Sequence, residues 1–356
     1  MVCHKRRALS LAVVLAGVTG CVLFVLLGDG QLPVHSSGQP LPEGIGQQPS
    51  SSSGTKSVHP EADTWTTGVV ETTGPRKHAS LARTWPSTTP VSTSRARDRC
   101  GLPAGGRWAT VELRGLPPFP MAVYAMHDVV SEKLRTVHRW EMADPAVYGR
   151  PGHAMDIGGN LGIYSLSLAK AGWNVTTWEP MPANLKLLRA SLCANSEVAP
   201  RIDLHEAGLS DVAETCRMVS DRTNTGDGTV MCRGENVVHQ RGHHFVVRGS
   251  FEMKVLDEEL PKLKFADQQV GFVKVDVEGF ECHVWRGARE LLKQRPRLIQ
   301  SEVWGEMQNC TPTEYLKLFR DAGYQIKKDA RCRTDARWTG PLRKSAIEDY
   351  FLCRRD

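Results

Sequence analysis

The chain lacks the patterns that mark zinc-binding and nucleic-acid-binding proteins. None of its ten cysteines forms a Cys-x-x-Cys pair, and no tight group of His, Asp and Glu has the spacing of metal ligands. We therefore predict no metal. The formal net charge of +6 is spread over 356 residues, and no basic stretch is interleaved with aromatic residues. A nucleic-acid partner is therefore not expected.

Charged residues are absent from residues 8–27, a mainly apolar run of twenty. As a helix, such a run is about 30 Å long, which matches the hydrocarbon core of a membrane. Basic residues precede the run, and no Lys or Arg follows it until Lys56. By the positive-inside rule, residues 1–7 are cytosolic and the remainder is lumenal, as in a type II membrane protein of the Golgi or endoplasmic reticulum. If the run is instead cleaved near residues 28–30, the protein is secreted.

Large apolar side chains are scarce in residues 28–99, which are rich in Ser, Thr, Pro, Gly and Gln. A segment of this composition buries too little surface to offset the entropy lost on ordering, so we predict a disordered stalk. Ser and Thr interspersed with Pro are typical of an O-glycosylated stalk, and an unmodified flexible tether is the alternative.

Eight of the cysteines lie beyond the apolar run, an even number that fits an oxidising compartment. Buried free thiols are the alternative. Cys216 and Cys232 flank a strong turn cluster, within residues 212–255, where the alternation of strands and helices is interrupted. We predict an antiparallel excursion there, with these two cysteines paired. Cys332 and Cys353 fall towards opposite ends of a predicted C-terminal hairpin and form the poorer pair.

A glycine-rich loop organises the part of the chain that follows. A short apolar run ends in the acidic residue Asp156, which opens the pattern Asp-x-Gly-x-Asn-x-Gly, from Asp156 to Gly162, and a helical pattern begins at Ile163. This order of strand, loop and helix opens a doubly wound α/β domain, and the first turn of the helix offers free N–H groups. Asn160 stands where the dinucleotide fingerprint has its second glycine, which disfavours an NAD-dependent oxidoreductase.

Two further stretches are expected at the same edge of the sheet. Residues 174–178 read as a second strand that is followed by Glu179, and an acid in this place binds ribose hydroxyls in doubly wound nucleotide folds. Lys274, Asp276 and Glu278 follow one another at alternate positions where a buried strand ends. A loop for a charged tail and an acid for a ribose suit S-adenosylmethionine.

With these three motifs in order, the chain closely resembles the FkbM-type methyltransferases. Their hallmarks are the Asp-x-Gly-x-Asn-x-Gly loop, a Glu-Pro dipeptide after the second strand, and Lys-x-Asp-x-Glu-Gly-x-Glu after the fourth, all intact here. The resemblance covers residues 151–356, with weaker similarity back to about Met121. It implies a class I methyltransferase-like Rossmann fold: an α/β, doubly wound, mostly parallel sheet with a reversed last strand.

The resemblance also implies S-adenosylmethionine as the cofactor. Residues that match the family's loop, acid and adenine-side turn are then the predicted cofactor-binding set: Asp156, Gly158, Gly159, Asn160, Gly162, Glu179 and, from a partial match, Leu209. Residues 100–150 form a lead-in with a strand near residues 107–113 and a helix capped by Asp128. In relatives such a helix can lean over the cofactor cleft, and a plain cover on the sheet is the alternative.

Transfer of a methyl group to a hydroxyl needs a base for the departing proton. Asp276 is the predicted base, and Lys274 and Glu278 are the predicted catalytic residues beside it. A helix cap for Asp276 and an internal salt bridge for the other two are the structural alternatives. His283 and His153 are the reserve candidates for the base.

The sequence thus predicts a membrane-anchored O-methyltransferase that acts on a hydroxyl of a glycan or another acceptor of the secretory pathway. A catalytically inactive methyltransferase-fold module that binds a partner or a glycan is the alternative. Asn174 and Asn309 each begin an Asn-x-Thr triplet, which accepts a glycan only if it enters the lumen.

Overall fold

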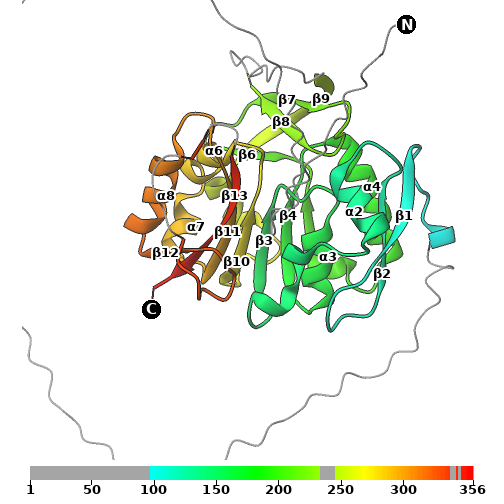
Figure 1. Cartoon of the computed structure of the whole chain (residues 1–356), viewed down its shortest axis with the longest axis horizontal. Coiled ribbons are helices and arrows are strands. Elements are labelled where there is room, and N and C mark those ends of the chain that lie inside the picture. The colour runs from blue at the N-terminus through cyan, green and yellow to red at the C-terminus, as the bar shows by residue number, and fades with distance from the viewer. Residues whose placement is uncertain (1–96, 233–244, 337–341, 344–345, 356) are drawn as a thin grey trace, which may run out of the picture. The chain divides into compact units, whose positions relative to one another are not determined.

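The computed structural model describes residues 97–355 except 233–244, 337–341 and 344–345 (Figure 1). The predicted membrane anchor and the predicted stalk up to residue 96 lie outside the described residues. Within the described part of the chain, none of the helices has the length and apolar character needed to cross a membrane.

A seven-stranded sheet forms the centre, in the order β12-β13-β11-β10-β3-β4-β5. β13 alone runs opposite to the other six strands, so the predicted mostly parallel sheet with a reversed last strand is confirmed. The strands are β3 (His153–Ile157), β4 (Asn174–Trp178), β5 (Ile202–His205), β10 (Val270–Val275), β11 (Leu298–Trp304), β12 (Tyr324–Lys327) and β13 (Ile347–Arg354).

Helices cover both faces of this sheet. Successive residues of β3 belong to different cores: Ala154 packs with α3 and α4, whereas Met155 packs with α6, α7 and α8. All five residues of β3 are buried because the strand is covered on both faces, so its apolar residues do not alternate with exposed ones. The helices are α3 (Ile163–Lys170), α4 (Pro182–Ala194), α6 (Glu281–Arg286), α7 (Arg289–Lys293) and α8 (Pro312–Asp321).

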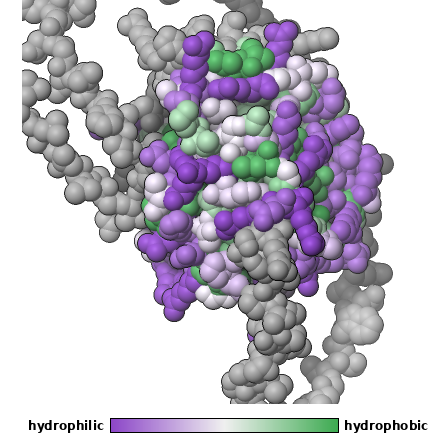
Figure 2. Space-filling model, turned by 90° about the vertical axis from the view of Figure 1, so that its right-hand side faces the viewer, coloured by the Kyte–Doolittle hydropathy of each residue, from purple (hydrophilic) through white to green (hydrophobic). Residues whose placement is uncertain are grey.

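The lead-in is fastened to α4. Its strands β1 (Gly106–Val111) and β2 (Phe119–Tyr124) pair only with each other, and the helix α2 (Val129–Thr136) follows with Asp128 as its N-cap, as predicted. The N–H of Ala122 donates to Ser191 Oγ of α4 at 2.8 Å, and the disulfide Cys100–Cys193 adds a covalent link. The face on this side of the molecule is mostly hydrophilic, with small scattered hydrophobic patches (Figure 2).

A second, four-stranded sheet interrupts the α/β alternation, as predicted for residues 212–255. Its order is β6-β9-β7-β8, and its strands are β6 (Gly208–Ser210), β7 (Thr215–Asp221), β8 (Gly228–Met231) and β9 (Phe245–Val255). Figure 1 shows β7, β8 and β9 above one end of the central strands. The short helix α5 (Leu256–Glu259) then leads back towards β10.

All eight cysteines beyond residue 99 are paired, so the alternative of free thiols is wrong. The predicted bond Cys216–Cys232 is confirmed, and Cys100–Cys193, Cys282–Cys310 and Cys332–Cys353 complete the set. The low rank given to the last pair was wrong. After β12 the chain turns back on itself, with the Ala336 N–H donating to the Ile326 carbonyl, and this return brings Cys332 beside β13.

Candidate functional site

A pocket lies where the carboxyl ends of β3, β4 and β10 meet the inserted sheet. Parallel strands end at one edge, so the motifs that follow them come together there. Six of the predicted site residues line this pocket: Gly158, Asn160, Glu179, Leu209, Asp276 and Glu278. The other four, Asp156, Gly159, Gly162 and Lys274, lie behind its wall.

The glycines of the loop are required by the protein's own packing. Gly158 has φ +81°, and a Cβ there would overlap the carbonyl oxygen of Asp276 on the neighbouring strand. A Cβ on Gly162, at φ +85°, would overlap the side chain of Leu188. The loop therefore lies tightly against β10 and α4, and these contacts fix the path of the backbone that faces the pocket.

Glu179 is buried and held by three donors. Its carboxylate accepts from the N–H groups of Asn160 and Met181, both at 2.7 Å, and from Asn184 Nδ2 at 3.3 Å. Burial raises the pKa of Glu179 to about 7 against these hydrogen bonds. The carboxylate is thus fixed at the pocket wall, in a position that suits the predicted contact with ribose hydroxyls.

The turn at Gly226 joins this network to the lead-in. The Gly226 carbonyl accepts from Asn160 Nδ2 at 3.2 Å and from Asn184 Nδ2 at 3.0 Å, while its N–H donates to Asp128 Oδ2 at 3.0 Å. Tyr124 donates its hydroxyl to Asn184 Oδ1 at 2.8 Å. The sequence indicated only a turn at Gly226 and a cap at Asp128, and it gave no sign that the two meet beside the pocket.

The lead-in helix contacts the two strands of the lead-in, which differs from the predicted cover on the central sheet. The body of α2 packs on β1 and β2, whereas its N-cap reaches the turn that lines the pocket. A Cβ at position 226 would overlap Asp128 Oδ2, so a larger residue there would displace the Asp128 carboxylate. The lead-in thus supports one wall of the pocket.

Lys274 is buried behind the loop. Its ammonium group donates to the Gly158 carbonyl at 2.6 Å and lies 3.4 Å from Asp276 Oδ2 and 3.8 Å from Asp156 Oδ1. Burial by itself lowers the pKa of Lys274, but the two carboxylates together raise it. The internal salt bridge foreseen as the structural alternative is present, and it places a fixed positive charge beside Asp276.

Asp156 is fully buried beneath the loop. Its Oδ2 accepts from Ser165 Oγ at 2.5 Å, and its Oδ1 has no hydrogen-bond partner among the described residues. Burial raises the pKa of Asp156, and Lys274 partly opposes this. Asp156 acts on the pocket through the loop and Lys274, because its side chain has no exposed surface.

Acidic side chains gather at the mouth of the pocket. Carboxylate oxygens of Asp276, Glu278 and Glu302 lie within 4.8 Å of one another, and a hydrogen bond joins Glu278 to Asp227. Burial, followed by the charge of Asp227, raises the pKa of Glu278 well above its usual range. Asp276 keeps 36% of its side-chain surface exposed, so it is accessible to an acceptor.

Glu302 was missed from the sequence. It lies in β11, directly after the polar residues Gln300 and Ser301, and its Oε2 accepts from Trp304 Nε1 at 2.6 Å. Burial, and then Asp276 and Glu281, raise its pKa well above the usual range. A run of polar residues that ends in a carboxylate, inside a predicted central strand, was the available signal.

The residues that are able to hold a metal form two groups within the described segments. One is Asp276, Glu278 and Glu302, and the other is Glu214, Cys216 and Cys232. The two cysteines of the second group are joined in a disulfide. In the first, the Lys274 ammonium group already lies beside Asp276, and we assign no metal to it.

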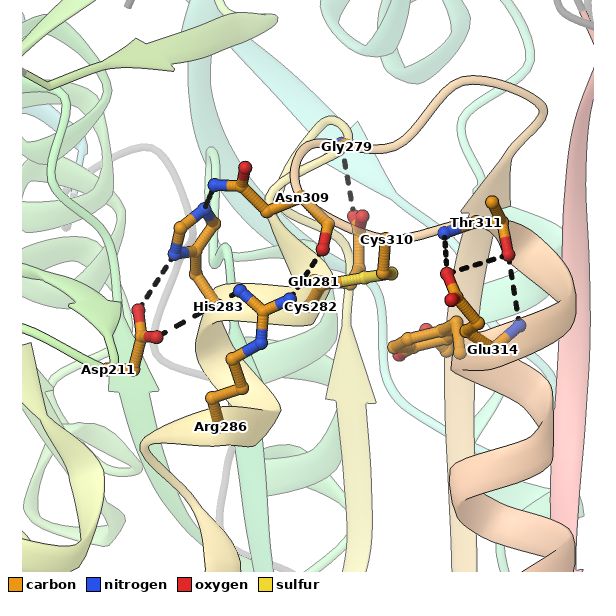
Figure 3. Close-up of a disulfide and its surroundings, with 12 residues drawn as sticks. Asp211, Gly279, Glu281, Cys282, His283, Arg286, Asn309, Cys310, Thr311 and Glu314 are labelled. Carbon is orange, nitrogen blue, oxygen red and sulfur yellow. Dashed lines mark hydrogen bonds and ion pairs between the residues drawn. A yellow bond between two sulfur atoms is a disulfide. The ribbon is translucent and has the colours of Figure 1, made fainter. Parts of the chain in front are cut away.

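The two reserve candidates for the base are wrong. His153 lies at the start of β3, at the far edge of the sheet, where its Nε2 contacts Thr176 Oγ1 at 2.9 Å. His283 has both ring nitrogens engaged, with Asp211 Oδ1 at 2.8 Å and Asn309 Nδ2 at 2.6 Å. Figure 3 shows His283 between these partners and beside the Cys282–Cys310 disulfide. His283 is not among the residues that line the pocket; it stacks on Phe280, which does line it.

The side chains that line the pocket are of the types that would bind S-adenosylmethionine. Glu179 offers a fixed carboxylate for ribose hydroxyls, and Asn160 Oδ1 is buried without a hydrogen-bond partner among the described residues. Apolar side chains of the inserted sheet form a further wall suited to a planar base: Leu209, Met218, Val230 and Met253.

Comparisons with known proteins agree with this assignment. Residues 156–326 match the model of the methyltransferase FkbM domain. Methyltransferase sdnD of Sordaria araneosa is 27% identical over 196 residues, which cover 49% of this chain and 74% of that protein.

Solved structures of methyltransferases are similar in part. Methyltransferase FkbM from Methylobacillus flagellatus KT is 18% identical with a TM-score of 0.34, over 57% of this chain and 44% of that one. This chain therefore spans less than half the length of that protein. A SAM-dependent methyltransferase from Agrobacterium tumefaciens is 13% identical with a TM-score of 0.35, over 69% of each chain.

Proposed function

We propose that this chain, in which residues 156–326 belong to the FkbM methyltransferase family and S-adenosylmethionine is the cofactor, methylates a hydroxyl group of a secretory-pathway glycan. The observation that carries the proposal is the set of four disulfides, since such a set is typical of a protein that folds in an oxidising compartment. Hydroxyl-rich glycans are abundant acceptors in that compartment. The predicted N-terminal anchor would hold the domain on the lumenal side.

Asp276 is proposed to remove the proton of the acceptor hydroxyl. The bound cofactor supplies an electrophilic methyl group in line with that oxygen. Asp276 is the accessible carboxylate at the pocket mouth, and the Lys274 ammonium group 3.4 Å away keeps a positive charge beside it. A positioned base contributes about 10²–10⁴-fold to the rate, and alignment of the acceptor contributes more.

Glu278 is proposed to assist by holding a proton. It shares a hydrogen bond with Asp227, and burial raises the pKa of both carboxyl groups. Two close carboxyl groups cannot readily both be ionised, so the pair carries about one negative charge. A singly protonated pair places less negative charge beside Asp276, the proposed acceptor of the proton.

The test is turnover by the full chain, purified from secretory cells in detergent. With methyl-labelled S-adenosylmethionine and a pool of secretory glycans, the label should enter the glycans as a methyl ether, a linkage that is stable to base. The Asp276→Asn variant should bind the cofactor and transfer no label. Cofactor binding by both proteins without transfer to any glycan would reject the glycan acceptor, and it would favour the alternative of a binding module.

Topology is tested separately, through the two glycosylation triplets. Asn174 lies at the start of β4, and Asn309 lies in the loop before α8. If the domain is lumenal, N-glycosidase should lower the mass of the membrane-associated protein, and replacement of both residues by Gln should abolish the shift. An unshifted protein with reduced cysteines would contradict the lumenal location.

A further inference from the structure

Four arginines meet at the edge of the central sheet that is opposite the pocket. β13 runs antiparallel to β11, and the pairing of Leu298 with Cys353 brings the residues before β11 beside those that end β13. The resulting arginine patch consists of Arg295, Arg297, Arg354 and Arg355. Three of the four are exposed, and Arg354 is half-buried.

The patch is held by main-chain carbonyls. Arg354 Nη1 donates to the Arg295 carbonyl at 3.1 Å, and Arg295 Nη2 donates to the Arg355 carbonyl at 3.0 Å. Arg297 Nη2 donates to the Tyr148 carbonyl. A carbonyl orients a guanidinium group and leaves its charge in place. The side chains of Arg295, Arg297 and Arg354 are therefore ordered in advance, with donors left over.

No carboxylate of the described residues lies within 4.0 Å of the patch's guanidinium nitrogens. Elsewhere cations do pair, as Arg189 does with Glu206 and Lys327 with Asp335. Burial, and then the nearby Arg354, lower the pKa of Arg297, which is the expected sign of crowded like charges. Asp356 lies outside the described residues, and one acidic side chain does not balance four arginines.

We infer that the arginine patch binds a sulfated or carboxylated polysaccharide. Planar guanidinium forks match the geometry of sulfate and carboxylate groups, and four of them fit successive charges of one linear chain. An anionic membrane surface fits less well, because the strongly anionic leaflet faces the cytosol and the disulfides favour a lumenal domain. The inference rests on the proposed compartment and not on methyl transfer.

Retention of the full chain on immobilised heparin tests the patch. Arg355→Glu reverses one charge at a side chain whose guanidinium group makes no hydrogen bond or ion pair within the described part of the chain. Arg114→Glu is the matched control, since Arg114 is likewise exposed and lies in the lead-in between β1 and β2. Heparin affinity should fall about tenfold for Arg355→Glu at moderate salt and change little for Arg114→Glu. Arg297→Gln should show a smaller loss in the same direction.

Three results would overturn the inference. Both glutamate variants could lose retention equally, which would indicate a response to net charge alone. In the second, neither glutamate variant loses retention on heparin. In the third, the protein binds phosphatidylserine vesicles but binds neither heparin nor dextran sulfate. Binding of the demethylated cofactor should be the same in Arg355→Glu and wild type, so failure of the patch is distinguishable from failure of the proposed function.

Discussion

The two edges of the central sheet differ in whether their charged side chains are buried or exposed. At the carboxyl edge, the lead-in and the inserted sheet cover Glu179, Glu278 and Glu302, and burial raises the pKa of each. At the amino edge, Arg295 and Arg355 are exposed. Buried ionisable groups have shifted pKa values and are suited to acid–base catalysis. Exposed charges attract oppositely charged molecules and are suited to binding.

Loss of the accessible carboxylate should have the largest effect at the carboxyl edge. Asp276→Asn keeps the shape and removes the proton acceptor, so the turnover rate should fall about 10²–10⁴-fold, with cofactor affinity and thermal midpoint nearly unchanged. Asp335→Asn is the control, because Asp335 pairs with Lys327 away from the pocket. A destabilised but active Asp276→Asn protein would instead identify a structural residue.

Removal of the Glu179 carboxylate, which is predicted to bind the ribose, should have the second-largest effect. Glu179→Ala leaves the ribose hydroxyls without an acceptor and should weaken binding of the demethylated cofactor by about 1–3 kcal/mol, measured by calorimetry. Glu206→Ala provides the control, since Glu206 contacts Arg189 at the surface. Unchanged affinity in Glu179→Ala would remove Glu179 from the cofactor site.

The covered edge should also respond to pH. Ionised Glu179 is the better acceptor, so cofactor affinity should rise as the pH passes through about 7. Its folded pKa exceeds the unfolded value of 4.5, so its contribution to stability is present below pH 4.5 and is lost as the pH rises through 7. Lys274 opposes this shift, and Tyr124 faces the same carboxyl group.

Glu179→Gln separates these two effects. The variant should bind the cofactor with a flat pH profile between pH 6 and about 8. As the pH increases over this interval, the thermal midpoint of Glu179→Gln should rise relative to that of the wild type. Only the wild type must bury a negative charge at position 179. Parallel profiles for the two proteins would assign the titration to another group, such as Glu281, whose pKa burial also raises to about 7.

The smallest effect is expected where the lead-in supports the pocket wall. Asp128→Ser keeps a cap for the Ser131 N–H but does not reach Gly226, so KM for the cofactor should rise about fivefold with kcat nearly constant. Asp144→Ser, which changes the cap of a short helix remote from the pocket, is the control. Equal loss in both variants, or a fall in kcat alone, would contradict a positioning role for Asp128.

Local pattern and strand order were enough to place much of the carboxyl edge. The loop, Glu179 and Asp276 each follow a strand, and parallel strands end at one edge, so their meeting was predictable. Cys216 and Cys232 stand symmetrically about a turn, which fixed their pairing. These features depend on neighbours in the sequence or on the rule that orders a doubly wound sheet.

The remaining features depend on contacts between distant segments. Glu302 reaches the acidic cluster because β11 lies beside β10, and Asp128 meets Gly226 across 98 positions of the chain. The partners that occupy His283 lie 72 and 26 positions away. Neither hydrophobic periodicity nor motif spacing indicates a contact between such distant residues. The sequence by itself therefore determined which strands are followed by functional residues, while tertiary packing decided which side chains face the pocket.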